Sequence, residues 1–371
     1  MRVGVPTETA AGENRVALVP DGVGRLVKAG LEVMVQAGAG ARAHFNDDAY
    51  AKSGATLADA ARVFAESDLL VKVRRPSFDE IKLIQPDRAI ASLMQPASSG
   101  EIFGSLATAR ITALAMELVP RISAAQSLDV LSSQATIAGY KAVLIGAAAM
   151  SRMLPMMITA AGTLIPAKVF IIGAGVAGLQ AIATSRRLGA VVSAFDVRAA
   201  ARQEIESLGA TFITKAEQPK DAEAAGGYAR ELKDDEARLI LEAIGGHIHD
   251  QDLVISTAQI PGRPAPRLVT AQMVAAMRPG SVIVDLAAET GGNCELTKLG
   301  ETVESNGVAI YGPSNIAATI PTHASQMYSR NIEAMLKLLV KDGQFNLDLQ
   351  DRIIGPMVVT HQGEIRYGKS H

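Results

Sequence analysis

The sequence predicts an α/β protein built from two domains. Its 371 residues are more than one compact core usually holds. In the first 130 residues, short apolar runs alternate with segments of helical periodicity, which is typical of sheets covered by helices. A later apolar run, at residues 168–172, leads into a glycine-rich turn. We therefore expect two α/β domains, of which the second carries this turn.

The glycine-rich turn is the most specific pattern in the chain. Val169 to Ile172 is typical of a strand buried on both faces, and Leu179 to Leu188 of a helix that stops at Gly189. A second apolar run, Val191 to Phe195, ends in Asp196. Between the first strand and the helix lie Gly173, Ala174, Gly175, Val176, Ala177 and Gly178. This order is the dinucleotide-binding fingerprint of a Rossmann-like domain.

Each part of the fingerprint has a physical role, although GxGxxG alone is weak because glycines also serve ordinary turns. Gly173 permits the tight turn, Gly175 lets backbone approach a pyrophosphate at the helix N-terminus, and Gly178 lets helix pack on strand. Asp196, 18 residues after Gly178, can accept hydrogen bonds from both hydroxyls of an adenosine ribose. Its charge would repel a 2′-phosphate, which favours NAD(H). Arg198 is the one residue that would favour NADP(H) binding, unless it is a solvated charge after the strand.

Composition excludes several classes of function. Hydrophobic residues make up 48%, charged residues 20%, and the net charge is −2, so no basic surface for nucleic acid or anionic lipid is expected. Cys294 is the single cysteine, which favours a reducing cytosol. The N-terminus lacks the apolar core of a signal peptide. The longest uncharged stretch, Met153 to Ala167, contains two prolines and is too short for a bilayer, so no direct membrane insertion is expected.

The chain order suggests where the domains lie. Five runs are expected to be strands of the first domain: Arg2–Pro6, Glu32–Gln36, Leu69–Arg74, Ala89–Met94 and Ile111–Met116. Two segments are expected to be its helices: Gly22–Ala29 and Leu57–Ala65. Three further strands are expected in the nucleotide domain: Leu253–Thr257, Ser281–Leu286 and Val308–Tyr311.

Two long helices are expected to join the domains around a cleft. From Ser133 to about Met153 the apolar residues follow one helical face, and a second amphipathic helix follows Pro321. The tail to His371 is too short to fold alone and should pack on the first domain. The first domain then comprises residues 1–132 plus 322–371, and the NAD(H)-binding Rossmann domain comprises 133–321. Dinucleotide enzymes usually work in such a cleft.

Residues 215 to 238 differ from the rest of the chain. They carry twelve charged side chains, almost no large apolar ones, and Gly226 and Gly227 beside Tyr228. The segment is either a solvated surface loop or a mobile flap with Tyr228 at its tip. Composition does not decide between these interpretations.

A second candidate site follows the strand Ile111–Met116. Arg121, Gln126 and Asp129 offer a cation, an amide and a carboxylate on a loop expected to face the cleft. The alternative makes Asp129 or Ser132 a helix cap and Arg121 a surface charge.

Other candidates for chemistry are weak. His247 and His249 lie close in sequence, but no cysteine or third histidine is nearby, so we expect no metal site. Cys294 is better explained as a small packed residue than as a nucleophile. The expected chemistry is hydride transfer by the cofactor itself, which needs positioning and exclusion of water more than a protein acid or base.

Several motifs carry a family resemblance. They include RISAAQSLDVLSSQ from Arg121, AGYKAV from Ala138, GAGVAGLQAIATSRRLGA from Gly173, DVRAA from Asp196, AGGYARE and VDLAAETGGNC. The chain resembles, over nearly its whole length, the NAD(H)-binding component (alpha subunit, domain I) of the Re/Si-specific, proton-translocating NAD(P) transhydrogenase. The resemblance implies that this component passes hydride between its NAD(H) and NADP(H) held on a partner subunit.

The resemblance also assigns roles to residues. Arg121, Gln126 and Asp129 would be the catalytic signature loop, which positions NAD(H) and meets the second nucleotide. The residues implied to bind the cofactor are Ser132, Ser133, Gly173, Ala174, Gly175, Val176, Ala177, Gly178, Asp196, Val197, Arg198 and Tyr228. The segment with Tyr228 would be the mobile loop that closes over NAD(H).

The partners follow from the same resemblance. The family's component is a homodimer that docks on an NADP(H)-binding component and a transmembrane subunit, which moves protons. The expected location is cytoplasmic, peripheral to the inner membrane through these partners. Because the sequence shows no membrane segment, we expect one polypeptide of a several-subunit enzyme, although a segment of a longer chain would give the same pattern.

Alanine dehydrogenase, in the same superfamily, is the alternative. Arg15 and Lys72 match the arginine and lysine that hold its substrate carboxylate. Its histidine position reads Gln95 here, and its aspartate position reads Glu289. Losing the histidine would remove the proton relay for oxidative deamination. A third possibility is an NAD-binding regulator without chemistry, which would bind NADH but transfer no hydride.

Overall fold

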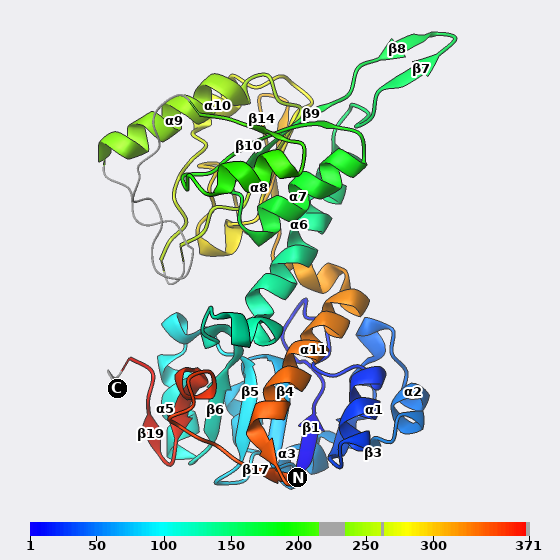
Figure 1. Cartoon of the computed structure of the whole chain (residues 1–371), viewed down its shortest axis with the longest axis vertical. Helices are drawn as coiled ribbons and strands as arrows, with labels where there is room; N and C mark the ends of the chain where they lie inside the picture. The colour runs from blue at the N-terminus through cyan, green and yellow to red at the C-terminus, as the bar shows by residue number, and fades with distance from the viewer. Residues whose placement is uncertain (215–233, 261–262, 369–371) are drawn as a thin grey trace. The chain divides into compact units, whose positions relative to one another are not determined.

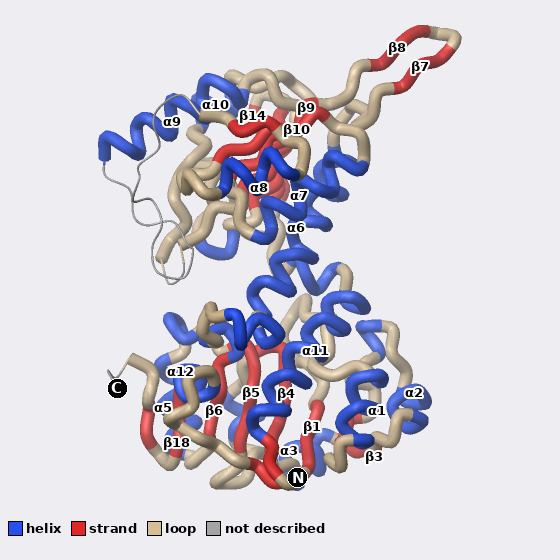
Figure 2. Tube along the Cα trace, in the orientation of Figure 1, coloured by secondary structure: helices blue, strands red, loops and turns tan. Residues whose placement is uncertain are grey.

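The computed structural model describes residues 1–214, 234–260 and 263–368, and the chain divides into two compact units. Unit 1 comprises Met1–Gln134 and Ala317–His371, and unit 2 comprises Ala135–Ile316 (Figure 1). Each unit contains one mainly parallel sheet with helices on both faces (Figure 2). The predicted α/β fold class with two Rossmann-like sheets is confirmed.

Unit 1 contains an eight-stranded sheet in the order β19-β18-β6-β5-β4-β1-β2-β3. Its strands are β1 (Arg2–Val5), β2 (Glu32–Gln36), β3 (Thr56–Ala58), β4 (Leu69–Arg74), β5 (Ala89–Leu93), β6 (Thr112–Ala115), β18 (Val358–His361) and β19 (Glu364–Ile365). β1 to β6 are parallel, whereas β18 runs antiparallel to β6 and to β19. The end of the chain therefore extends the sheet formed by its beginning.

Alternate residues of these strands pack under different helices. Val3 and Val71 belong to a core with α1, α2, α11 and α12, whereas Leu70 and Ile90 belong to a core with α3, α4 and α5. The helices are α1 (Pro20–Lys28), α2 (Asp47–Lys52), α3 (Ala60–Glu66), α4 (Phe78–Ile81), α5 (Gly100–Thr108), α11 (Pro321–Leu339) and α12 (Ile354–Met357). The period of two along each strand explains why both faces are apolar. A short hairpin, β16 (Val340–Lys341) with β17 (Gln344–Phe345), follows α11.

One predicted helix of unit 1 is partly wrong. Residues 57–65 were expected to be helical, but Leu57 lies in β3 and pairs with Val35 of β2. The helix begins only at Ala60, because the Asp59 side chain accepts a hydrogen bond from the Arg62 backbone N–H at 2.9 Å. Such a cap ends the strand and starts the helix within one residue.

Unit 2 contains a seven-stranded sheet in the order β11-β10-β9-β12-β13-β15-β14. Its strands are β9 (Lys168–Ile172), β10 (Val191–Phe195), β11 (Thr211–Phe212), β12 (Leu253–Ser256), β13 (Val282–Asp285), β14 (Thr302–Ser305) and β15 (Val308–Tyr311). All neighbours are parallel except the β14–β15 pair. Its helices are part of α6 (Val130–Ala149), α7 (Val176–Arg187), α8 (Ala201–Ser207), α9 (Asp234–Ile248) and α10 (Ala271–Ala275).

The order of the central strands places the fingerprint at a switch point. β9 has β10 on one side and β12 on the other, so the chain leaves β9 in one direction and later returns to its opposite edge. Open parallel sheets bind ligands at the carboxyl ends of strands where this reversal occurs. The turn that starts at Gly173 lies at that end of β9.

Two segments differ from their predictions. The helix expected from Ser133 begins three residues earlier, at Val130, and ends at Ala149 rather than Met153. Residues 234–238 of the predicted 215–238 loop belong to α9, where Arg238 donates a hydrogen bond to Glu242 one turn later at 3.2 Å. This intrahelical pair stabilises a helix where the charged composition had suggested a loop. The remainder of the predicted flap, including Tyr228, lies outside the described residues.

A two-stranded hairpin extends from unit 2, formed by β7 (Met157–Thr159) and β8 (Gly162–Leu164) (Figure 1). All six strand residues are exposed. Exposure is 76% for Ile158 in β7 and 69% for Ile165, which follows β8. Across the described ranges, no helix combines the length and the apolar character needed to cross a bilayer.

Candidate functional site

The turn after β9 is built around two glycines that no other residue could replace without strain. Gly173 has a φ of +96°, in the region that favours glycine, and its N–H donates to the Phe195 carbonyl at 2.8 Å. A Cβ on Gly178 would lie 1.9 Å from the Gly173 carbonyl oxygen. The Thr257 hydroxyl also donates to that oxygen, at 3.0 Å. These contacts fix the start of α7 directly against the end of β9.

Gly175 has the opposite environment. It is the N-cap of α7, it makes no side-chain capping bond, and a Cβ built on it would meet nothing within 4 Å. The next residue, Val176, is 40% exposed. The start of α7 therefore has open space beside Gly175 and no side-chain cap, at the positive end of the helix dipole. A phosphate or pyrophosphate group fits such a position.

Two alanines complete the turn. Ala174 is buried, and its N–H is held by Asp196. Ala177 packs against α6, where a Cβ on Gly139 would lie 2.1 Å from the Ala177 carbonyl oxygen. The close approach of α6 and α7 thus depends on Gly139, which the sequence alone did not single out.

Asp196 ends β10 beside this turn and is only 6% exposed. One carboxylate oxygen, Oδ2, accepts a hydrogen bond from Ala174 N at 2.7 Å. The other, Oδ1, accepts one from Arg198 N at 2.8 Å. The Arg198 side chain adds bonds to both oxygens, from Nε to Oδ1 at 2.9 Å and from Nη2 to Oδ2 at 3.0 Å. The interpretation of Arg198 as a solvated charge is therefore wrong, because its guanidinium is engaged by Asp196. Val197 between them is half-buried.

Two loops at the carboxyl edge of the unit 2 sheet are tied together by residues that sequence reasoning missed. The Asn293 amide donates to the carbonyls of Ala258 and Pro266, at 2.8 and 2.9 Å, and accepts from Ala258 N. Asp285, fully buried, accepts bonds from Ser256, Ala287, Cys294 and Thr297. These contacts give the motif VDLAAETGGNC a structural role that its sequence alone does not reveal.

In unit 1, the predicted signature loop forms a short 3-10 helix, η4 (Ser123–Leu128), after an exposed Arg121. Gln126 is exposed on η4, and its side chain makes no hydrogen bond with the residues that the structure describes. Asn331 of α11 donates to the Ser127 carbonyl at 2.8 Å and so holds η4 against that helix. Asn331 was not predicted, since nothing in its local sequence marks it.

The remaining loop residues start a helix. Asp129 accepts hydrogen bonds from the Ser132 backbone N–H at 2.9 Å and from the Ser132 hydroxyl at 2.6 Å, which caps α6. The Ser133 hydroxyl lies 2.7 Å from Asn331 Oδ1. These contacts match the capping interpretation of Asp129 and place both serines in the framework of the loop.

Unit 1 also contains a buried network of charges at the carboxyl edge of its sheet. The Arg15 guanidinium donates to Glu13 from Nε at 2.8 Å and from Nη2 at 2.7 Å, and to Gln134 Oε1 at 2.8 Å. Lys72 donates to Glu80 at 2.7 Å and lies 3.6 Å from Glu8. Burial raises the pKa of Glu8. Both cations are thus neutralised by carboxylates of the chain itself.

Gln95 lies beyond the end of β5 in a left-handed conformation, with a φ of +51°. Glu117 enforces this conformation, because its two carboxylate oxygens accept hydrogen bonds from Met94 N at 3.0 Å and Gln95 N at 2.6 Å. Burial raises the pKa of Glu117. The Gln95 side chain is exposed, so a non-basic amide occupies this position.

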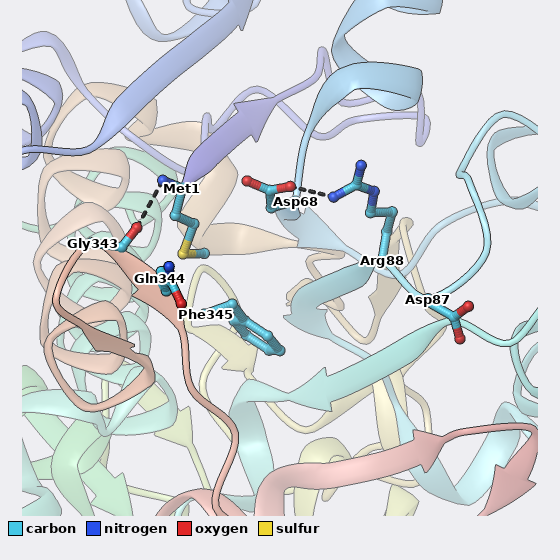
Figure 3. A pocket seen from close by; sticks show the side chains of 7 residues that line it. All are labelled: Met1, Asp68, Asp87, Arg88, Gly343, Gln344 and Phe345. Atoms are coloured by element: carbon cyan, nitrogen blue, oxygen red, sulfur yellow. Dashed lines mark hydrogen bonds and ion pairs between the residues drawn. The ribbon is translucent and has the colours of Figure 1, made fainter.

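A polar hollow of about 270 Å³ lies at the other edge of the unit 1 sheet (Figure 3). Its lining residues include Met1, whose ammonium donates to the Gly343 carbonyl at 2.8 Å, and Asp68, which pairs with Arg88. These residues precede β1, β4 and β5 and so mark the amino ends of the strands. Because ligands of open α/β sheets bind at the carboxyl ends, this hollow is not the candidate site.

Of the two histidines near residue 248, His247 takes part in packing. His247 Nε2 lies 2.7 Å from the Ser193 hydroxyl, and the ring packs edge-on against Phe170. Burial lowers the pKa of His247. Among the residues that the structure describes, no three His, Cys, Asp or Glu side chains are grouped so that they could hold a metal ion.

Comparison with known proteins gives a consistent result. The family description "Alanine dehydrogenase/PNT, N-terminal domain" matches residues 4–138, and "Alanine dehydrogenase/PNT, C-terminal domain" matches residues 142–368. A Rhodospirillum rubrum protein that forms the first of the parts of NAD(P) transhydrogenase subunit alpha is 45% identical to this chain. The match covers 98% of this chain and 97% of that protein.

Solved structures show the same similarity. The structure of transhydrogenase from Sinorhizobium meliloti superposes with a TM-score of 0.90 at 44% identity, covering 98% of this chain and 100% of the other. An L-alanine dehydrogenase gives a TM-score of 0.83 at 28% identity, covering 99% and 97%.

Proposed function

Because the chain belongs to the alanine dehydrogenase/PNT family, we propose that it is the NAD(H)-binding component of a proton-translocating transhydrogenase. In this proposal unit 2 binds NADH, and hydride passes directly to NADP⁺ held on a partner subunit, with Re/Si specificity. The bound nicotinamide ring supplies the hydride chemistry. The residues of this chain bind the nucleotide, orient it and exclude water.

The observation that carries the proposal is the turn at Gly173–Gly178 with Asp196 beside it. Gly175 leaves open space above uncapped N–H groups, where a pyrophosphate would be held. Asp196 is the carboxylate suited to an adenosine ribose, and its charge favours NAD(H) over NADP(H). Val197, half-buried after Asp196, would support the adenosine.

The proposal gives the unit 1 loop a separate task. Gln126 is exposed on η4, while Asp129, Ser132 and Ser133 fix the loop and the start of α6. Arg121 and Gln126 are the side chains that would meet the nucleotides, and Asp129 would act by positioning the loop. A neutral amide can donate to one nucleotide and accept from the other without adding charge.

We propose that the chain works as a homodimer with membrane partners. The β7–β8 hairpin exposes an apolar surface, including Ile158 at 76% and Ile165 at 69%, that a second copy would cover. The dimer would dock on an NADP(H)-binding component and a transmembrane subunit that couples transfer to proton movement. This assigns the chain to the cytoplasmic side, peripheral to the inner membrane.

Alanine dehydrogenase activity is the second candidate, supported by the 0.83 TM-score to such an enzyme. Two observations argue against it. Arg15 and Lys72 are held by Glu13 and Glu80, so a substrate carboxylate would have to displace internal ones. The exposed residue after β5 is Gln95, which cannot accept a proton at working pH.

A nucleotide titration tests the proposal. The purified chain should bind NADH more tightly than NADPH, and hydride transfer should appear only after the NADP⁺-loaded partner component is added. With alanine and NAD⁺ alone there should be no reduction. Alanine turnover in the usual range of about 1–1,000 per second would instead favour the second candidate. NADH binding without transfer to the partner would indicate a regulator.

A further inference from the structure

The carboxylate of Asp196 is already saturated in this structure. Its oxygens accept the four hydrogen bonds described above, two from backbone N–H groups and two from the Arg198 guanidinium. An ionised carboxylate offers about four lone-pair positions in total. A ribose diol that donates two hydrogen bonds to Asp196 therefore needs two existing bonds to be released.

The structure indicates which two bonds can be released. The N–H groups of Ala174 and Arg198 are backbone donors, fixed by the turn and by the end of β10. The Nε and Nη2 donors belong to a flexible side chain that is 18% exposed, so it has a path to solvent. A guanidinium can move by side-chain rotation, whereas moving either backbone donor would disrupt the fingerprint turn.

We propose that Arg198 is a specificity-determining residue, whose guanidinium competes with the adenosine ribose diol for Asp196 and moves aside when the dinucleotide binds. The inference rests on the proposed function, in which unit 2 binds NADH at this turn. The proposal concerns the ratio of NADH affinity to NADPH affinity. The acid at position 196 does not set this ratio alone.

The competition has opposite consequences for the two nucleotides. For NADH, two hydrogen bonds of an ion pair within the protein are exchanged for two hydrogen bonds from neutral hydroxyls, so the ion pair weakens NADH binding. For NADPH, the guanidinium partly neutralises Asp196 and offers a bidentate partner to a 2′-phosphate. Arg198 therefore reduces the preference for NADH over NADPH that Asp196 alone would give.

Replacing Arg198 separates this role from a structural one. In Arg198→Ala, Asp196 keeps its backbone donors, and water takes the place of the guanidinium. We expect NADH to bind about three- to tenfold more tightly and NADPH about three- to tenfold more weakly, since a partly exposed ion pair is a modest competitor. If Arg198 only stabilised the β10–α8 connection, its removal would instead lower the melting temperature and weaken the binding of both nucleotides.

Arg202→Ala is the matched control. Arg202 lies on α8 close to Arg198 in sequence, and its guanidinium packs over the Phe212 ring at 4.9 Å. Its removal changes the net charge by the same amount but leaves the Asp196–Arg198 pair intact. The ratio of NADH to NADPH affinity should stay at the wild-type value in this variant. An equal change of the ratio in both variants would mean a general charge effect and would overturn the proposal.

The ribose diol itself is tested with ADP-ribose and its 2′-deoxyadenosine analogue as probes. The gain from Arg198→Ala should be present for ADP-ribose and reduced for the analogue, which lacks one hydroxyl. An NADH affinity that is unchanged or weaker in Arg198→Ala overturns the role of Arg198, although the proposed function stands if wild type binds NADH. If wild type binds neither nucleotide, the proposed function fails as well.

Discussion

Gly175 and Gly178 lie three positions apart, and replacing each with alanine should have opposite effects on stability and on NADH binding. A Cβ at Gly178 would lie 1.9 Å from a backbone oxygen that cannot rotate away, whereas one at Gly175 would meet open space. We expect Gly178→Ala to destabilise the chain by about 1–3 kcal/mol through overpacking. Gly175→Ala should leave the melting temperature nearly unchanged and weaken NADH binding, because the methyl group would occupy space needed by the pyrophosphate.

Thermal unfolding and NADH titration of both variants check this pair. A Gly178→Ala variant as stable as wild type would contradict the packing described for α7 and β9. Unchanged NADH affinity in Gly175→Ala would remove the pyrophosphate from this turn.

Individual side chains show where sequence reasoning reached its limit. The fingerprint glycines could be predicted because backbone conformation and close approach restrict the residue type directly. The partner of Arg198 could not, since a charged residue after a strand has the same local sequence whether its side chain faces solvent or Asp196. Asn331 is a clearer case, because it holds η4 from a helix 204 positions away from Ser127.

The central strands were predictable because they are short, apolar and bounded by turn residues. β2, β4, β10 and β15 occupy the residues expected of them. The elements that were missed have mixed or charged sequences, such as β3 and α9. β3 is determined by its pairing with β2 and by the Asp59 cap that follows it, and neither contact is visible in a local pattern.

The β7–β8 hairpin gives a prediction about assembly. Ile158 and Ile165 expose apolar surface, and we propose that a second copy of the chain buries it. Ile158→Glu with Ile165→Glu should therefore convert a dimer into a monomer in sedimentation experiments at micromolar concentration. Leu299→Glu is the control, because Leu299 is 52% exposed on the loop before β14. A double variant that stays dimeric would place the interface elsewhere.

The connections at the amino edge of the unit 2 sheet give a pH prediction. Asp250 pairs with Arg278 before β13 and with Lys168 at the start of β9, at 3.0 Å. These hydrogen-bonded cations, Arg278 foremost, lower the pKa of Asp250 from 3.8 to about 2. Because the folded-state pKa lies below the unfolded value, the pairs stabilise the fold above that unfolded value. Their contribution is lost as the pH falls towards about 2.

Asp250→Asn should accordingly melt below wild type at neutral pH, and the difference should shrink as acid protonates Asp250 in the wild type. The effect should be small and weaker in high salt, since the carboxylate is half-exposed. Melting curves from pH 6 down to pH 3 would check it. A melting-temperature difference that stays constant with pH would show that the charge of Asp250 is not responsible for it.

The whole molecule contains two related sheets. The two sheets differ in the connection that follows the first strand of each unit, and we expect this difference to give them different roles. In unit 2 this connection is a glycine turn that leaves open space at Gly175. In unit 1 the corresponding edge is filled by the buried network of Glu8, Glu13, Arg15 and Lys72. The same architecture therefore offers one place for a phosphate and one place that is closed by internal ion pairs. We therefore expect each chain to bind a single dinucleotide, in unit 2.

Gln126 provides the test that distinguishes dinucleotide binding from transfer to a partner. The loop around it is fixed by the Asp129 cap and by Asn331, so a change at Gln126 should leave the fold intact. Gln126→Asn shortens the amide by one methylene. We expect NADH affinity within a few-fold of wild type, but hydride transfer reduced by roughly a hundredfold, because small misplacement of reacting groups is heavily penalised.

The measurement is pre-steady-state transfer from bound NADH to an NADP⁺ analogue on the partner component, with NADH affinity measured alongside. Ser127→Ala, an exposed position on the same 3-10 helix, should transfer at the wild-type rate and is the control. Wild-type transfer in Gln126→Asn would make Gln126 part of the loop framework only. Loss of NADH binding in step with transfer would assign it to the first nucleotide alone. Only a loss of transfer with NADH binding retained fits a residue that works between two nucleotides.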